Sequence, residues 1–190
     1  MCGRFALEHK DDFDTRFQLG NHLDLNSKYD FFPGSETPVI VKENFNFLWL
    51  MKWGLIPFWA KDRSIGHHLF NARAESVTQK PSFKKSFLDK RCLIPASGFF
   101  ESKKYIQIKD QPYFSLAGLY DIWVDPVSGI ENYTYTIITT EPNSAIKPFH
   151  HRMPVIFNQA KESIWLNPST PVSSLQSLLK PYPSELTLIK

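Results

Sequence analysis

The sequence has few cysteines and no long apolar run. Its two cysteines, Cys2 and Cys92, lie far apart and match no zinc-ligand spacing, and one disulfide would do little for a chain of 190 residues. No apolar segment approaches the roughly 18 residues that a membrane helix needs, and the first residues lack the apolar core of a secretory signal. We therefore expect a cytoplasmic protein with no bound metal and no membrane contact.

The chain also has little excess of charge of one sign, since its net charge is only +3. The charged residues are nevertheless unevenly distributed along the sequence. Residues 61–91 carry eight basic and three acidic side chains, whereas acidic residues outnumber basic ones before residue 61 and balance them after residue 91. Basic side chains that converge on one face could follow a phosphate backbone, and the alternative is a solvated loop and helix rim. They are Lys61, Arg63, Arg73, Lys80, Lys84, Lys85, Lys90 and Arg91.

Strand-like segments make up most of the chain. Apolar residues alternate or run together at 37–57, which predicts strands with a hairpin arm at 45–56. Later segments rich in aromatic and β-branched residues are separated by turn residues at the spacing of antiparallel meanders. These later strands are predicted at 91–100, 105–108, 112–123 and 132–140, with a last strand at 186–189.

Helical patterns are shorter and lie between or after the strands. No repeat or linker interrupts the sequence, so we expect one α+β domain over residues 1–190. In this fold antiparallel sheets dominate and helices pack at the margins. The predicted helices are 10–19, 81–90, 158–166 and 171–180.

The sequence begins Met1-Cys2-Gly3, and methionine is commonly removed before a small second residue such as cysteine. The mature chain would then begin with a 1,2-aminothiol, in which an amine with a pKa of about 7.7–8.0 adjoins a thiol with a pKa of about 8.5. Such a group condenses with an aldehyde, because the amine forms a Schiff base and the thiol closes a thiazolidine ring on the same carbon. A cysteine at position 2 is usually an accident of sequence, so other residues must support this interpretation.

Two polar groups stand within apolar, strand-like segments. Asn71, Arg73 and Glu75 alternate with alanines, so an extended backbone would point all three side chains to one side. Glu101 follows a long apolar run, where burial and a nearby amine would shift its protonation. Glu101 is therefore the candidate partner of the Cys2 amine. Glu101 could instead pair with a surface lysine, and Arg73 could form a structural ion pair with Glu75.

A third polar group contains His150 and Arg152, which precede an apolar strand. An imidazole beside a guanidinium suits proton transfer next to an anion, although a single histidine is more often structural. The tryptophans are mostly core candidates by their surroundings. Trp53 and Trp59 could also supply a stacking surface for unpaired bases.

Six short motifs, taken together, carry more information than any one of them. They are Met1-Cys2-Gly3-Arg4-Phe5, Trp53-Gly54-Leu55-Ile56-Pro57, Asn71-Ala72-Arg73-Ala74-Glu75, Arg91-Cys92-Leu93-Ile94-Pro95, Gly98-Phe99-Phe100-Glu101 and His150-His151-Arg152-Met153-Pro154. In order and spacing they resemble the SOS-response-associated peptidase (SRAP) family, over residues 1 to about 157. Members of that family form DNA–protein crosslinks at abasic sites in single-stranded DNA through an N-terminal cysteine, after autocatalytic or aminopeptidase loss of Met1.

The resemblance implies a barrel-like fold and a role for each candidate residue. Cys2 would be the crosslinking nucleophile, Asn71 would orient the reacting chain end, Glu101 would hold or deprotonate the α-amine, and His150 would assist sugar-ring opening and crosslink reversal. The partner would be single-stranded DNA with an abasic site, bound by a monomer that needs no cofactor and is nucleoid-associated when on DNA. The implied DNA contacts are Arg4, Trp53, Arg73 and Arg152, the arginines acting at flanking phosphates.

The chain departs from the family pattern at two places. The family commonly has Trp after the glutamate, where this chain has Ser102. It commonly reads Tyr-Asn before a proline-containing loop, where this chain has Tyr29-Asp30. The first departure removes an expected stacking contact, and the second puts a possible negative charge near the expected DNA path.

Three other functions fit parts of the sequence. An N-terminal-nucleophile glutamine amidotransferase also often begins Met-Cys-Gly, but the later motifs do not resemble that family, and glutaminase activity would identify it. A non-covalent reader of damaged DNA would bind equally well after Cys2→Ala. A general thiol peptidase follows from the family name more than from visible chemistry, and the only proteolysis we expect is removal of Met1.

Overall fold

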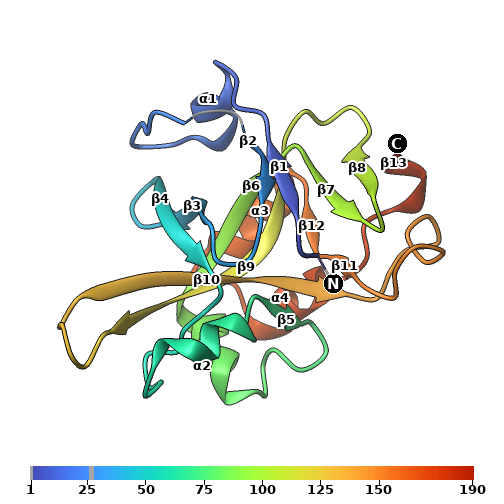
Figure 1. Cartoon of the computed structure of the whole chain (residues 1–190). Coiled ribbons are helices and arrows are strands. Elements are labelled where there is room, and N and C mark those ends of the chain that lie inside the picture. The colour runs from blue at the N-terminus through green and yellow to red at the C-terminus, as the bar shows by residue number, and fades with distance from the viewer. Residues whose placement is uncertain (1, 26–27) are drawn as a thin grey trace.

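The computed structural model, shown in Figure 1, describes residues 2–25 and 28–190 and is centred on a closed β-barrel. The barrel strands pair in a ring, and β9 pairs with β10 to close it. Neighbouring strands run antiparallel except β4 and β10, which are parallel. The ring consists of β10 (Glu131–Thr140), β4 (Asn46–Trp53), β3 (Glu36–Lys42), β6 (Arg91–Ala96) and β9 (Phe114–Val124).

Close packing inside the barrel explains one glycine. A Cβ atom on Gly118 of β9 would lie 2.3 Å from the Ile94 side chain and 3.0 Å from the Cys92 sulfur of β6. Interiors are packed too densely to accept such an overlap. Further along, β9 and β10 continue as a hairpin that extends to the left of the barrel in Figure 1.

A second, antiparallel sheet joins the beginning of the chain to its end. Its order is β13 (Thr187–Ile189), β8 (Lys104–Ile108), β7 (Gly98–Glu101), β1 (Phe5–Leu7) and β2 (Lys28–Phe31). The predicted strand at 91–100 is therefore divided, because Ser97 separates β6 of the barrel from β7 of this sheet. β1 has only three residues, all buried, and was too short for sequence patterns to reveal.

The four predicted helices are present with adjusted ends. α1 is shorter than predicted, because Gln18 adopts a left-handed conformation (φ 52°) that stops the helix before Gly20. Pro81 opens α2, and the Asn158 side chain caps α3 by accepting a hydrogen bond from the Lys161 amide. The helices are α1 (Phe13–Phe17), α2 (Pro81–Asp89), α3 (Gln159–Leu166) and α4 (Val172–Leu178).

Short strands extend the barrel sheet at its edges. β5 and β11 pair with β10, and β12 pairs with β9. The predicted α+β fold with dominant antiparallel sheets, a barrel and peripheral helices is confirmed. None of the helices in the described part of the chain combines the length and apolar character that crossing a bilayer requires. The short strands are β5 (Asn71–Arg73), β11 (Met153–Pro154) and β12 (Ile156–Phe157).

Candidate functional site

Cys2 is fully buried where the two sheets meet. The pairing of β1 with β7 continues as the Phe100 amide donates to the Arg4 carbonyl at 2.9 Å. This register brings the segment before β1 to the end of β7, where Glu101 lies. From the barrel side, Asn71 on β5 donates its Nδ2–H to the Cys2 carbonyl at 2.8 Å. Two predicted site residues therefore lie against Cys2, one from each sheet.

Burial dominates the electrostatics around Cys2. Burial, and then the nearby charge of Glu101, raise the pKa of the Cys2 thiol to about 12. Burial also raises the pKa of Glu101, whose residue is 6% exposed. The burial of Glu101 therefore does not fit the alternative in which it forms a surface ion pair with a lysine, Lys103 or Lys104. Met1, whose removal the predicted chemistry requires, lies outside the described residues.

The segment that carries His150 approaches Glu101 from the loop before β11. Ser102, which follows Glu101, donates its hydroxyl to the Phe149 carbonyl at 2.9 Å. Burial lowers the pKa of His150, and the stacked His151 ring lies 4.3 Å away between centroids. A charge on His151 acts on Glu101, where it opposes the rise in pKa. The loop that carries both histidines thus lies beside the Glu101 carboxylate. Ser102, the first departure from the family pattern, holds the loop there.

The row of Asn71, Arg73 and Glu75 is not continuous. β5 ends at Arg73, and the chain turns at Ala74, so Glu75 leaves the row. Its carboxylate instead forms two hydrogen bonds with the Arg152 guanidinium, at 2.8 and 2.9 Å. The prediction that one extended strand presents all three groups is wrong for Glu75, because the turn follows directly after the last pairing of β5 with β10.

Arg4 lies on the outer side of the same region. Its Nε–H donates to Asp30 at 2.6 Å, and its guanidinium lies 3.9 Å from the centroid of the Phe100 ring. Arg4 is partly exposed, with 39% of its side chain accessible. Asp30, the second departure from the family pattern, therefore partly neutralises a predicted phosphate contact.

Trp53 does not offer a stacking surface. It is 1% exposed, packs against Phe5 and Tyr135, and donates its indole N–H to the Phe70 carbonyl at 2.7 Å. Its position in the barrel core contradicts the predicted base contact, because no ring face is accessible. Sequence surroundings could not separate this tryptophan from Trp59, which is 47% exposed.

Phe58 is an exposed aromatic residue that the sequence analysis missed. It lies next to Trp59 in the loop after β4, is 48% exposed, and its ring faces Lys85 Nζ at 4.3 Å from the centroid. An exposed aromatic pair with a cation beside it is the surface type that bases stack on. The sequence feature that could have indicated this surface is the aromatic pair Phe58-Trp59 directly after Pro57.

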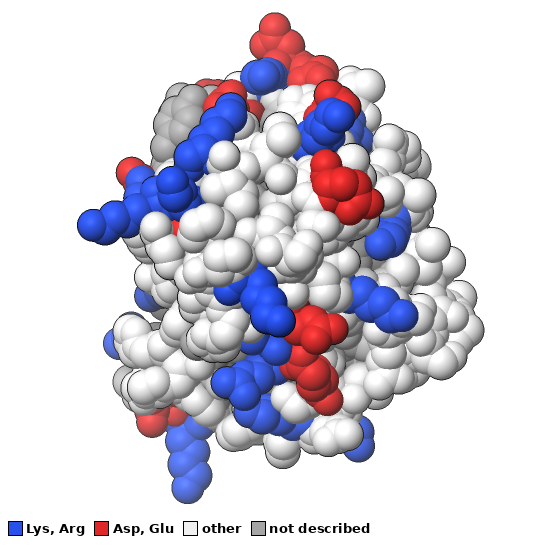
Figure 2. Space-filling view, turned by 90° about the vertical axis from the view of Figure 1, so that its right-hand side faces the viewer, with Lys and Arg blue, Asp and Glu red and all other residues white. Residues whose placement is uncertain are grey.

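The basic segment is only partly a surface feature. Arg91 is buried, and its guanidinium donates to backbone carbonyls at the ends of α2 and α3. Lys90 bonds the buried carboxylate of Asp121 at 2.5 Å. Figure 2 shows a face on which Lys and Arg side chains are interspersed with Asp and Glu rather than forming an unbroken basic surface. Two of the eight basic residues thus have structural roles.

Cys92, the second cysteine, lies on β6 in the core. Burial raises its pKa well above the ordinary thiol value. Among the described residues, no predicted site residue forms a hydrogen bond with it, whereas Asn71 bonds the Cys2 carbonyl. Across residues 2–25 and 28–190, no group of three or more His, Cys, Asp or Glu side chains is arranged to hold a metal ion.

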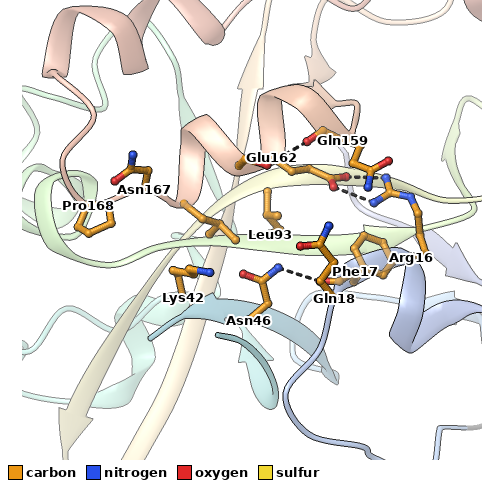
Figure 3. Close-up of a pocket in the computed structure, with 12 residues that line it drawn as sticks. Arg16, Phe17, Gln18, Lys42, Asn46, Leu93, Gln159, Glu162, Asn167 and Pro168 are labelled. Carbon is orange, nitrogen blue, oxygen red and sulfur yellow. Dashed lines mark hydrogen bonds and ion pairs between the residues drawn. The ribbon is translucent and has the colours of Figure 1, made fainter. Parts of the chain in front are cut away.

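A pocket of about 290 Å³ lies away from Cys2, between α1, α3 and the barrel (Figure 3). There Arg16 forms two hydrogen bonds, both 2.8 Å, with the carboxylate of Glu162. Glu162 also accepts the Ser115 hydroxyl at 2.8 Å. This ion pair ties α1 to α3, and its donors and acceptors are bound to one another.

Three similarities place the chain among known proteins. The family model described as SOS response associated peptidase (SRAP) matches residues 1–190. The abasic site processing proteins YoqW and YoaM of Bacillus subtilis are 42% and 41% identical, each over 97% of this chain and over 89% and 88% of their own lengths. A crystal structure of a protein from Bacteroides thetaiotaomicron superposes with a TM-score of 0.92 at 34% identity, covering 99% of this chain and 90% of that chain.

Proposed function

The chain belongs to the SOS response associated peptidase family, and from this membership we propose that it processes abasic sites in single-stranded DNA by covalent capture through Cys2. The curated relatives named abasic site processing proteins support the lesion as target. The captured strand would be shielded during the response to DNA damage.

One observation carries the proposal. The Cys2 carbonyl is held by Asn71 while the buried Glu101 acts electrostatically on its thiol. An N-terminal nucleophile needs its chain end fixed and a proton acceptor beside it. A buried backbone carbonyl needs a donor in any case, so the feature that favours a reactive cysteine is the carboxylate placed beside it in apolar surroundings.

Loss of Met1 supplies the second nucleophile. Water adds across the Met1–Cys2 peptide bond, which releases methionine and leaves a free α-amine on Cys2. At neutral pH that amine is partly protonated, so it must give up a proton before it attacks a carbonyl. Glu101 would take this proton, and its raised pKa makes it a better acceptor than an ordinary carboxylate.

The capture step needs no oxidant and releases one water. The amine nitrogen adds to the aldehyde carbon of the opened sugar. The carbinolamine hydroxyl takes up a proton and leaves as water, and the nitrogen then releases a proton to give a neutral imine. The thiol sulfur then adds to the imine carbon while the S–H proton passes to nitrogen. One C–N and one C–S bond replace the C=O bond, and a thiazolidine ring results.

His150 would serve the sugar rather than the cysteine. The closed sugar opens when the C1′ hydroxyl loses a proton and the ring oxygen gains one. An imidazole whose pKa is lowered by burial is largely neutral at neutral pH and can both donate and accept. Release of the crosslink runs in reverse: the C–S bond opens to the imine, water adds to the imine carbon and frees the amine, and the same proton transfers at His150 then close the sugar ring and trap the released aldehyde.

DNA would follow exposed basic and aromatic side chains on the surface. Arg4 and Arg73 are accessible to phosphates, and Phe58 with Trp59 offers ring faces to unpaired bases. An abasic nucleotide has no base to be flipped, so an unpaired strand on this surface suffices.

The test is a denaturing gel with Met-less protein and a labelled single strand that carries one abasic site. The proposal expects a slowly migrating band that an intact strand does not give. Cys2→Ser, which keeps the amine and lacks the thiol, should give this band only after borohydride reduction of the imine. Absence of the denaturation-resistant band, together with native-gel binding that Cys2→Ala leaves unchanged, would support a non-covalent reader, and glutaminase activity would support an amidotransferase.

A further inference from the structure

The ion pair between Glu75 and Arg152 joins two groups of unlike exposure. The Arg152 side chain is 11% exposed and that of Glu75 is 54% exposed, yet both Nη atoms bond the carboxylate. Nη2 also donates to the Thr139 carbonyl of β10 at 2.6 Å. The guanidinium is thus fixed between the turn after β5 and the barrel, with both Nη atoms engaged and the buried Nε without a hydrogen-bond partner among the described residues.

The fixed guanidinium holds the backbone of the same residue. The Arg152 amide nitrogen lies 3.0 Å from His150 Nδ1, and the Arg152 carbonyl oxygen lies 3.1 Å from the same atom. One ring nitrogen of a neutral imidazole can satisfy only one of these groups, because it either accepts or donates.

Of the two Arg152 backbone groups, the amide N–H needs the hydrogen bond to His150 Nδ1 more than the carbonyl does. Unpaired backbone N–H groups are rarer in folded proteins than unpaired carbonyls, since a carbonyl has two lone pairs and tolerates partial satisfaction. With Nδ1 accepting from Arg152, the proton of the neutral ring resides on Nε2. That tautomer presents an N–H donor on the side of the ring away from Arg152.

We infer that Glu75 is a positioning residue for His150, acting through Arg152 to fix the imidazole in its Nε2–H tautomer. The inference rests on the proposed function in assigning His150 a proton-transfer role. It assigns Arg152 to the support of His150 rather than to a DNA phosphate. Glu75 lies in a turn and needs no contact with DNA for this effect.

A spectroscopic readout tests the tautomer without any DNA. Nitrogen-15 shifts of the His150 ring distinguish a protonated Nε2 from a protonated Nδ1. Wild type should show Nε2–H, and Glu75→Ala should show a mixture of tautomers, whereas Glu185→Gln, an exposed control, should leave the ring unchanged. A protonated Nδ1 in wild type, or no change in Glu75→Ala, would overturn the inference even if crosslinking occurs as proposed.

A kinetic cycle tests the consequence. In single-turnover crosslinking, Glu75→Ala should lower the limiting rate about threefold, a part of the roughly tenfold loss expected when the His150 imidazole itself is removed. The DNA concentration for half of that rate should stay the same. Glu75→Gln, which keeps one acceptor oxygen, should recover part of the loss.

In a His150→Ala background the Glu75→Ala effect should vanish, because the two changes act through one group. Fully additive losses, or a weaker half-saturation with an unchanged limiting rate, would contradict the positioning role and favour a phosphate contact by Arg152. A wild-type protein that forms no adduct would instead contradict the proposed function and leave the tautomer measurement to decide on Glu75.

Discussion

Glu101 and Glu162 are equally buried carboxylates in different surroundings. Each residue is 6% exposed. Glu162 receives both Nη atoms of Arg16 and the Ser115 hydroxyl, so a cation and a donor offset its burial (Figure 3). Burial of Glu101 instead raises its pKa, and the charge of Glu101 in turn raises the pKa of the nearby Cys2 thiol.

The difference separates a structural carboxylate from a reactive one. A buried carboxylate whose oxygens accept from a guanidinium and a hydroxyl holds two helices together. A buried carboxylate with a raised pKa binds a proton more readily than an ordinary carboxylate, which is what a general base requires. Burial alone therefore does not identify the site, and the partners of each carboxylate do.

The largest expected effect is on stability at the structural carboxylate. Glu162→Gln leaves the Arg16 guanidinium without its anion, which should lower the free energy of unfolding by about 3 kcal/mol. The crosslinking rate of the folded fraction should be unchanged, because Glu162 does not contact Cys2. Chemical denaturation measures the stability and single-turnover crosslinking measures the rate. A variant as stable as wild type that crosslinks more slowly would contradict the assignment of Glu162 as the structural carboxylate.

The reverse pattern is expected for Glu101→Gln. The crosslinking rate should fall about 100-fold, the scale of a lost general base, with DNA affinity nearly unchanged. Because the folded pKa of Glu101 is raised, its contribution to stability is complete below the ordinary Glu pKa and is lost as pH rises through the folded value. At neutral pH the variant should therefore be at least as stable as wild type.

A pH series sharpens the same contrast. In wild type the rate should drop on acidification through the raised pKa of Glu101, and Glu101→Gln should lack this drop. A matching acid limb in both proteins would assign the titration to another group.

The two histidines should differ by a smaller factor. His150→Ala should slow crosslink formation or reversal about tenfold, whereas His151→Ala should change either rate less than threefold, because only His150 is partly buried and bonded through Nδ1. Rates of formation and of release from a purified adduct give the comparison. The opposite ranking would transfer the role to His151.

The smallest effect concerns DNA binding before capture. The logarithm of the affinity should fall with the logarithm of salt, with a slope of about 0.7 for each phosphate contacted on a single strand. Arg73→Ala should reduce that slope by about one such contact. An unchanged slope would remove Arg73 from the DNA path.

The fold was largely predictable because its strands are long and strongly patterned. Periodicity located β9, β10 and the four helices, but not three-residue β1, whose pairing partners lie far along the chain. Motif resemblance selected Cys2 and Glu101, and the structure brings them together.

Long-range partners were not predictable. No local pattern indicates that Glu75 binds Arg152, 77 residues away, or that Trp53 is enclosed by the barrel while the aromatic residues after Pro57 are exposed. Such contacts depend on which loops the barrel brings together, and a linear pattern of residue types does not contain that information.

Intact-mass spectrometry of Met-less protein, after incubation with a single-stranded oligonucleotide carrying one abasic site, tests covalent capture by Cys2 most directly. The account predicts one adduct, with the mass of protein plus one oligonucleotide minus one water, and no such species without reduction in Cys2→Ala. Met-less wild-type protein that stays unmodified under these conditions would contradict it.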